Sequence, residues 1–280
     1  MWTKVLNRPL VQGQSAVHLA VMTGQVRALR WMLRRGASPD DRDLDGFGAL
    51  NCAAMHEDSV TAIALLGALL DAGLSVDTPD AHDGATALHS AAFFDRREVM
   101  GWLLKRGATI DAGDEAGRTP VMHALAGDKL QAAALLLAWG AKADARDHFG
   151  DTMLLQTGCT AEWADLLLAH GADLRRVDGE GRNLLHLAAL RGDKAMLRWA
   201  LKQGVDPTQL DIDGMTPLDA LEMEMFEVGM AQSDRSRLDT TADFGAGDGF
   251  GPYDLDEAEP AFESSLMLLR RHQPGPVAQA

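Results

Sequence analysis

The segment GRNLLHLAALRGD, residues 181–193, places a histidine, His186, inside an apolar run. A single histidine in this setting fits a catalytic base, a metal ligand or a structural residue. Related segments begin at other glycines, notably GATALHSAAFFDRRE from Gly84 and GQSAVHLAVMTGQVR from Gly13. A segment that recurs indicates a repeat architecture, and that architecture decides the fold.

The repeats are close to 33 residues long. Their first residues are seven glycines spaced 33, 38, 33, 33, 31 and 33 residues apart: Gly13, Gly46, Gly84, Gly117, Gly150, Gly181 and Gly214. A chain of stacked repeats forms one continuous core in which each unit mainly contacts its neighbours. The period therefore favours a solenoid over one or two globular domains.

Each repeat contains the same order of local signals. Two residues after the glycine stands a helix-capping residue such as Thr86 or Asn183, whose side chain accepts hydrogen bonds from the first free amides. We expect a short Ala- and Leu-rich helix next, then a second helix that ends at a glycine such as Gly107. An Asp- and Gly-rich turn leads to the next repeat. Gly48 replaces the capping residue in the second repeat, so we expect a weaker cap there.

This order of signals resembles the ankyrin repeat, whose signature is G-x-T-P-L-H-x-A followed by L-L-x-x-G-A-x-x-D. The resemblance covers roughly residues 10–225 and implies an all-α solenoid of stacked helix-turn-helix units with β-turn fingers. Asn51, Met122 and Leu155 replace the motif histidine in the second, fourth and fifth repeats. The second repeat has also gained about five residues, and the fifth has lost two.

Three histidines occupy the same position of the motif, namely His18, His89 and His186. The resemblance implies that each bridges a turn and a helix by hydrogen bonds. Because each layer contributes one such residue, the three rings cannot converge on a single metal or substrate. We therefore predict a structural role for them.

The domain organisation follows from the repeats and the acidic residues near the C-terminus. Between residues 222 and 263 there are twelve acidic and two basic residues, which favours a mobile loop. The seventh repeat would begin at Gly214, be interrupted by this loop and finish with a capping helix. The expected parts are a solenoid over 1–232, a flexible acidic insertion over 233–260, a capping helix over 261–273 and a tail over 274–280.

Signals for chemistry are weak. Asp41, Asp43 and Asp45 imitate the start of a calcium loop, but Cys52 stands where that loop needs a bidentate Glu. The chain contains no nucleophile elbow, phosphate loop, zinc-type spacing or dinucleotide fingerprint. We expect no catalytic residue, no metal ligand and no cofactor. The alternative is an enzyme or metal-binding protein that uses carboxylates of the insertion: Asp254, Asp256, Glu257 and Glu259.

Three tryptophans, Trp31, Trp102 and Trp199, fall at the same place in three second helices. Such a row is compatible with a docking surface. Aromatic residues at a helical period are more often packing residues, so we predict a half-buried outer row.

The expected function is binding to a protein partner, because a repeat scaffold fixes the backbone and leaves surface side chains free to vary. Turn tips and the ends of the first helices should form the concave binding face. For Phe93 and Phe94, packing between layers is an equal alternative. The candidate partner-binding residues are Phe47, Met55, His56, Phe93, Phe94, Arg118, Phe149, Arg182, Arg191 and Met215.

The net charge of −15 argues against nucleic acids and anionic membranes as partners. It favours a protein partner with a basic patch, bound by a monomer. Composition gives the impression of a bacterial protein, such as an effector or an immunity protein that neutralises a basic toxin. A structural spacer in a larger assembly is a third possibility.

The expected location is the cytoplasm, or outside the cell by a route that leaves no Sec-type signal. The opening residues MWTKVLNRPLVQGQS lack the apolar core of a secretory signal, and the longest apolar run, residues 132–141, is about half of a membrane span. The two cysteines, Cys52 and Cys159, are expected to be buried free thiols.

Overall fold

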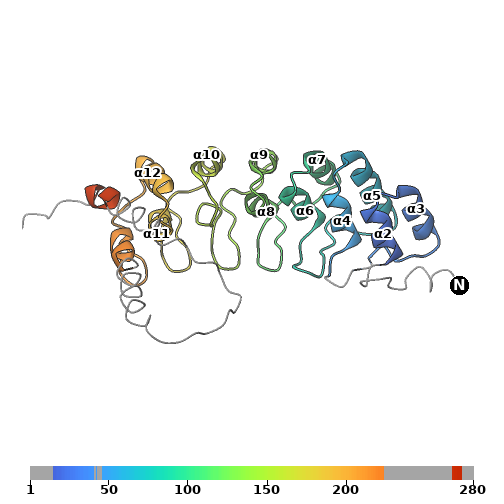
Figure 1. The fold of residues 1–280 in the computed structure, drawn as a ribbon, viewed down its shortest axis with the longest axis horizontal. Helices are drawn as coiled ribbons and strands as arrows, with labels where there is room; N and C mark the ends of the chain where they lie inside the picture. The colour runs from blue at the N-terminus through green and yellow to red at the C-terminus, as the bar shows by residue number, and fades with distance from the viewer. Residues whose placement is uncertain (1–14, 41, 43–45, 224–266, 273–280) are drawn as a thin grey trace, which may run out of the picture. The chain divides into compact units, whose positions relative to one another are not determined.

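The computed structural model describes residues 15–40, 42, 46–223 and 267–272. Over these residues the chain forms pairs of short helices joined by turns (Figure 1). It divides into two units. The N-terminal unit comprises Met1–Cys159 and Asp165–Ala172, and the C-terminal unit comprises Thr160–Ala164 and Asp173–Ala280.

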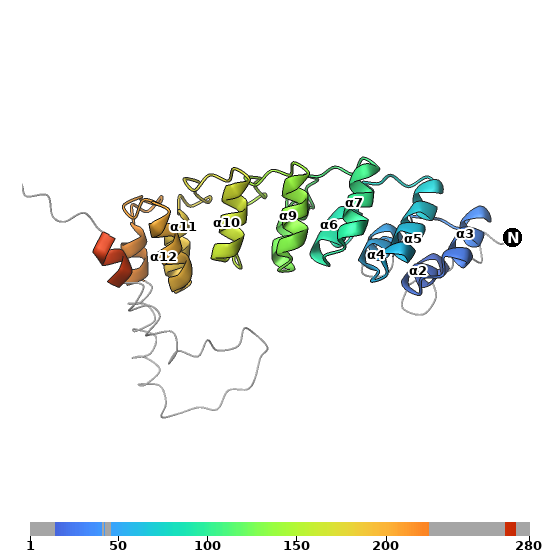
Figure 2. The ribbon, with the colours of Figure 1, turned by 90° about the horizontal axis from the view of Figure 1, so that it is seen from above.

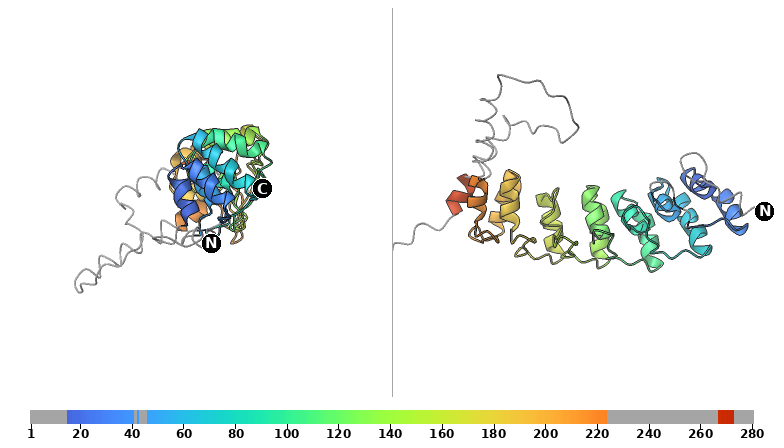
Figure 3. Two further views of the ribbon diagram at one scale, coloured as in Figure 1. Left: turned by 90° about the vertical axis from the view of Figure 1, so that its right-hand side faces the viewer. Right: turned by 90° about the horizontal axis from the view of Figure 1, so that it is seen from below.

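The N-terminal unit contains four helix pairs arranged in two layers. Its first helices contact one another in sequence order, and the second helices α3, α5 and α7 do the same (Figures 1 and 2). Figure 3 shows the same order of helices from below. The first helices are α2 (Ala16–Met22), α4 (Ala49–Met55), α6 (Ala87–Phe93) and α8 (Pro120–Ala126). The second helices are α3 (Val26–Arg34), α5 (Ser59–Asp71), α7 (Arg97–Lys105) and α9 (Leu130–Ala138).

The helices begin and end as the sequence predicts. The Ser15 hydroxyl accepts from the backbone N–H of His18, while Gly48 gives α4 no side-chain cap. Past α7, Gly107 has φ of +86°, the left-handed conformation that ends a helix at little cost in glycine. The apolar residues between these signals form the core, with Val17, Leu65 and Leu103 fully buried.

The five-residue gain of the second repeat mainly lengthens α5. This helix has 13 residues, whereas α3, α7 and α9 have nine each. Four residues add slightly more than one helical turn, so the added segment continues the helix without disturbing its packed face.

The fifth repeat departs from the expected pattern, because residues 153–158 form turns instead of a first helix. Leu155 N–H donates to the carbonyl of Thr152, three residues back, which is tighter than an α-helical turn. The repeat has lost two residues here, and Gly158 has φ of +91°. Met153, Leu154 and Leu155 nevertheless stay buried. The prediction of a regular first helix was therefore wrong in this repeat.

Helix α10 (Ala161–Ala169) follows, and the division between the two units falls within it. In the C-terminal unit, α11 (Leu184–Leu190) packs against α12 (Lys194–Lys202). Residues 217–223 and 267–272 are also helical, and the Arg270 guanidinium lies 2.8 Å from the Glu222 carboxylate. The latter helix falls within the range expected for a cap, whereas the expected insertion over 233–260 lies outside the described residues.

Two further sequence predictions concern exposure. Cys52 and Cys159 form no disulfide; Cys159 is buried as expected, but Cys52 is only half-buried. Within the described ranges, no helix is long and apolar enough to cross a membrane.

The tryptophan row is partly covered by arginines that follow it. The guanidinium of Arg35 lies 4.4 Å from the ring centre of Trp31, and that of Arg106 lies 4.5 Å from that of Trp102. Trp31 is still 44% exposed, and Trp199 is half-buried. Trp102 and Trp199 are thus half-buried, as predicted, whereas Trp31 is more exposed than predicted. Trp31 and Trp102 each carry a stacked cation.

Candidate partner-binding surface

The motif histidines tie each repeat to the next turn. Nδ1 of His89 accepts from the backbone N–H of Thr86 at 3.1 Å, so Nε2 carries the proton and donates to the carbonyl of Arg118 at 2.9 Å. His18 reaches the carbonyl of Phe47 at 3.0 Å in the same way. In the C-terminal unit, His186 reaches the carbonyl of Met215 at 3.1 Å. The three rings lie in different repeats and serve as structural bridges.

Burial lowers the pKa of two of these rings. Removal from water, together with the neighbouring ring of His123, lowers the pKa of His89 to about 4. Burial also lowers the pKa of His186. A neutral ring with one N–H donor and one bare nitrogen is the form that the bridge requires.

Replacements of the motif histidine behave differently. The amide of Asn51 takes over the bridge, because its Nδ2 donates to the carbonyl of Ala85 at 2.9 Å and to the hydroxyl of Ser90 at 3.2 Å. Met122 offers only a thioether sulfur, 3.4 Å from the N–H of Thr119, and Leu155 has no polar atom. The fourth and fifth repeats therefore lack an N–H donor at this position.

In four of the described turns, an aspartate accepts hydrogen bonds from the backbone of its own turn. Oδ1 of Asp114 accepts from the N–H groups of Ala116 and Arg118 at 2.9 and 2.8 Å. Burial alone would raise the pKa of Asp114, but hydrogen bonds from His123 and Arg118 outweigh it and hold that pKa below its ordinary value. Three aspartates accept comparable backbone bonds in later turns: Asp147, Asp178 and Asp211.

Main-chain hydrogen bonds link successive turns. The N–H of Glu115 donates to the carbonyl of Asp83 at 2.8 Å, and that of His148 to the carbonyl of Ala116 at 2.8 Å. The N–H of Ala81 likewise donates to Gly46, and in the C-terminal unit that of Ile212 donates to Glu180. These backbone bonds fix the spacing at which turn-tip side chains meet solvent.

The predicted turn-tip residues have different environments. The Phe47 ring stacks on His82 at 4.7 Å between ring centres, while Phe149 is 75% exposed. Arg118 lies 2.8 Å from the Asp114 carboxylate, and Arg182 lies 2.7 Å from that of Asp178. Both arginines therefore brace their own turns. Met215 is half-buried, and its carbonyl accepts from His186.

The predicted residues at the ends of first helices include an exposed aromatic pair. Phe93 and Phe94 are 37% and 40% exposed, with ring centres 5.0 Å apart and ring planes at 71°. Met55 and His56 are half-buried, and in the C-terminal unit Arg191 is exposed. Packing between layers therefore does not bury the two phenylalanine side chains completely.

Two exposed residues of α2 belong to the same surface but were absent from the prediction. Leu19 is 48% exposed and Met22 is 55% exposed. Met22 follows its repeat glycine by nine residues, as Met55 and Phe93 follow theirs, so alignment of the repeats would have identified it. Helices α2, α4 and α6 contact one another in order. We call the apolar row on these helices the apolar ridge; it consists of the exposed residues Leu19, Met22, Phe93 and Phe94 and the half-buried Met55.

One group of side chains has metal-like spacing. Ligand atoms of Asp83, Asp114 and His123 all lie within 4.8 Å of one another. The Arg118 guanidinium, however, lies 2.8 Å from the Asp114 carboxylate and 3.7 Å from that of Asp83, so a cation already occupies the group. Its arrangement is that of an ion-pair network.

Two predicted groups of carboxylates lie outside the described residues. The four carboxylates proposed for a metal or active site, Asp254, Asp256, Glu257 and Glu259, lie outside the described residues. The same holds for the three aspartates of the calcium-like segment, Asp41, Asp43 and Asp45.

Family models of ankyrin repeats match three stretches of the chain. A model described as "Ankyrin repeats (many copies)" matches residues 17–66, one of three copies matches residues 63–147, and another of many copies matches residues 167–220. These stretches contain nearly all the helix pairs described above.

Curated relatives contain similar repeats. The chain is 34% identical to the B-cell lymphoma 3 protein homolog of Mus musculus, over 50% of this chain and 32% of the relative. It is 30% identical to the ankyrin repeat protein nuc-2 of Neurospora crassa, over 72% of this chain and 19% of the relative. The chain thus spans about a third or less of these relatives. Both are eukaryotic, so they lend no support to the expected bacterial source.

Solved structures share the fold. The crystal structure of the ankyrin repeat domain of Bcl-3, described as a unique member of the IkappaB protein family, matches with a TM-score of 0.62 and 26% identity. The match covers 75% of this chain and 94% of that one. The human ASB11 ankyrin repeat domain matches with a TM-score of 0.58 at 22% identity, covering 76% of this chain and 97% of that one. With its paired helices, bridging histidines and linked turns, the chain belongs to the ankyrin-repeat family.

Proposed function

We propose that this protein is a non-enzymatic module that binds a protein partner through the apolar ridge and the neighbouring turn tips. Ankyrin repeats form protein–protein interaction modules, and the resemblance to family members supports that general role. The observation that carries the proposal is the exposure of Met22, Phe93 and Phe94 on helices that pack side by side.

The apolar ridge is suited to a hot spot. Folding leaves four of these side chains between 37% and 55% exposed, and burying a large apolar side chain contributes roughly 1.5–3 kcal/mol. Exposed aromatic residues on a rigid scaffold lose little entropy on binding and commonly dominate an interface. Phe93 and Phe94, which already contact each other, form the centre of the proposed site.

Charge adds a second element to the proposal. Residues 222–263 contain twelve acidic and two basic residues, which favours a partner with a basic patch and binding that weakens with salt. An inhibitor of a basic toxin and an effector are specific forms of this idea that rest on composition and charge alone. Both stay predictions, as does the monomeric state.

Affinity capture followed by titration tests the proposal. Wild-type protein should recover a dominant partner, and the purified partner should bind the double variant Phe93→Ala/Phe94→Ala at least about tenfold more weakly, since two hot-spot rings are removed. Val60→Ala provides the control, because Val60 is an apolar residue of α5 that is 74% exposed. Equal affinity of the partner for the double variant and for wild-type protein would refute the role of the ridge.

A further inference from the structure

The second helix of the first repeat, α3, is strongly basic in an acidic protein. Arg27, Arg30, Arg34 and the following Arg35 are all exposed, and the helix contains no acidic residue. The whole chain, by contrast, has a net charge of −15. This local reversal of charge is not explained by the apolar ridge, which lies at the ends of the first helices.

The basic residues share one face of the helix. Arg27, Arg30, Trp31 and Arg34 are spaced three, four and seven residues from the first, the spacing of neighbours on a helix surface. Leu29 and Met32, which lie between them in sequence, are buried. We call the exposed side of α3, with Arg27, Arg30, Trp31, Arg34 and Arg35, the arginine face.

A structural role accounts for only part of this face. Basic residues near a helix C-terminus interact favourably with the helix dipole, as Lys105 does in α7. Arg34 fits this explanation, but Arg27 lies in the first turn, where the dipole disfavours a cation. Like charges three and four residues apart also destabilise a helix. Among the described residues, Arg27, Arg30 and Arg34 have no ion-pair partner that would offset this repulsion.

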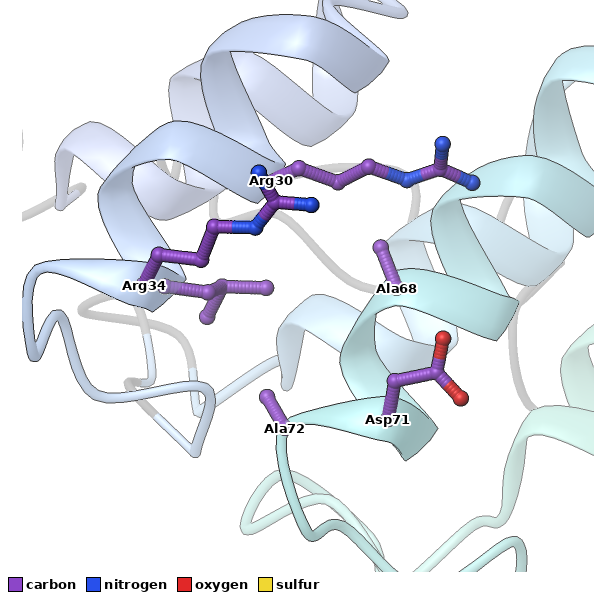
Figure 4. A pocket seen from close by; sticks show the side chains of 6 residues that line it. Arg30, Arg34, Ala68, Asp71 and Ala72 are labelled. Atoms are coloured by element: carbon purple, nitrogen blue, oxygen red, sulfur yellow. The ribbon is translucent and has the colours of Figure 1, made fainter.

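The arginine face borders two open hollows. One, of about 460 Å³, lies between α3 and α5, where Ala68 and Ala72 leave space beneath Arg30 and Arg34 (Figure 4). Figure 4 also shows the Arg30 side chain extended from α3 toward α5. The other hollow, of about 530 Å³, is lined by the five residues of the arginine face itself. Arg30 and Arg34 line both hollows. Asp71 also lines the first hollow, so the second hollow, lined by the arginine face, is the one that favours an acidic group.

We propose that the arginine face binds a short acidic peptide segment of a partner protein. Guanidinium groups bind carboxylates in a bidentate manner, and the indole of Trp31, 44% exposed, adds an apolar contact beside them. Arg27 to Arg34 span about 10 Å along the helix, which an extended peptide covers with three or four residues. A long polyanion would instead extend over a chain that is negatively charged overall.

The test measures binding of a fluorescent peptide of about eight residues in which Asp and Glu surround one Phe. Wild-type protein should bind it, and the affinity should fall at least about tenfold in Arg27→Gln/Arg30→Gln. The matched control is Arg97→Gln/Lys105→Gln, which removes the same charge from the equivalent helix α7 and should change the affinity less than about twofold. Phe93→Ala/Phe94→Ala should leave peptide binding unchanged, which separates this surface from the ridge.

Several outcomes would overturn the proposal. They are no binding by wild-type protein, an equal loss in the α7 control, or tighter binding of a DNA duplex or of phosphatidylserine vesicles than of the peptide. Melting curves by circular dichroism establish that the variants fold, and Arg27→Gln/Arg30→Gln should melt no lower than wild type because it relieves repulsion. Arg30→Lys keeps the charge and should show a smaller loss, because it removes bidentate bonding only. Full retention of affinity by Arg30→Lys would contradict bidentate recognition.

Discussion

At the scale of single residues, the motif histidine shows how one side chain connects two repeats. Its Nδ1 faces the capping residue of its own helix, and its Nε2 faces a carbonyl 29 residues later. Because the ring is fully buried, its chemistry is limited to these two bonds. The position of His18, His89 and His186 in the repeat was sufficient to predict this role.

The buried state of His89 predicts a loss of stability in acid. The unfolded chain binds a proton near pH 6.5, whereas the folded chain does so near pH 4, so the contribution is present above pH 6.5 and is lost as the pH falls toward 4. The loss amounts to about 3 kcal/mol. Urea unfolding measured between these pH values checks it.

His89→Asn removes this titrating ring and should reduce the pH dependence, leaving the part that His186 contributes. His170→Asn removes an exposed ring just after α10 and provides the control, with the wild-type dependence retained. A dependence that is equally steep in His89→Asn would mean that other groups cause the acid destabilisation.

The fourth repeat offers the reverse experiment. Met122 is buried and presents only a weak acceptor to the N–H of Thr119. Met122→His should restore the bridge toward the carbonyl of Asp151, which occupies the position of Arg118 in the previous repeat. One added buried hydrogen bond is expected to raise the free energy of unfolding by about 1 kcal/mol. A lower free energy at pH 7.5 in urea unfolding would argue that the imidazole does not fit.

Some features of single residues could not be predicted from the sequence. The replacement of histidine by Asn51 was visible, but whether its shorter side chain reaches the next turn depends on how the longer second repeat folds. Arg118 and Arg182 looked like binding residues, yet each holds a carboxylate of its own turn. Such a choice between a partner and a local aspartate depends on side-chain geometry.

At the scale of elements, helix ends could be predicted from single residues, whereas the outcome of insertions and deletions differed between repeats. The capping residues and terminal glycines predicted where helices begin and end, and the insertion in the second repeat was absorbed as an extra turn of α5. The lost first helix of the fifth repeat was not predicted. Its apolar residues stay buried without a regular helix, and the apolar pattern alone does not distinguish the two.

Leu103→Ala tests the placement of the second helices. Leu103 is fully buried in α7, so removal of its side chain should lower the free energy of unfolding by about 2–5 kcal/mol. Val60→Ala, at an exposed position of α5, should change it by less than about 0.5 kcal/mol. Urea titration measures both, and a neutral Leu103→Ala would contradict the packing of α7.

Substitution by alanine should have opposite effects on stability at two glycines. A Cβ on Gly127, at the end of α8, would collide with the carbonyl oxygen of Phe93. Gly127→Ala should therefore lower the free energy of unfolding by about 1–3 kcal/mol and weaken partner binding at Phe93. A Cβ on Gly101, within α7, meets no atom within 4 Å, so Gly101→Ala should stabilise by about 0.5–1 kcal/mol. Thermal melting that gives both changes the same sign would contradict this contrast.

At the scale of the whole molecule, the net charge did not predict the charge of individual surfaces. The net charge of −15 led to an expectation of basic partners, yet most of the excess acid lies between residues 222 and 263, and α3 presents arginines. The repeat period predicted the architecture because seven repeats begin at intervals close to it. A single helix whose charge differs from the average leaves little trace in composition, so the arginine face emerged only when exposure was known.

Stacking predicts a gradient of stability along the N-terminal unit. Helix α6 contacts two other first helices, α4 and α8, whereas α2 contacts only α4 among the described first helices. Neighbour contacts supply much of the stability of a repeat, so amides of α6 should exchange at least about tenfold more slowly than those of α2. Hydrogen exchange followed by mass spectrometry checks the order, and equal protection would indicate that the unit opens only as a whole.

The linked turns carry an evolutionary consequence. Alanine, glutamate, histidine and isoleucine all donate the same kind of inter-turn bond, at Ala81, Glu115, His148 and Ile212, because the donor is the peptide group common to every residue except proline. A substitution at a turn tip can therefore alter which molecule is recognised, while the backbone hydrogen bonds between the turns persist. Selection for a new interaction and selection for foldability can then proceed with little interference, and a lineage can exchange ligands without passing through unfolded intermediates.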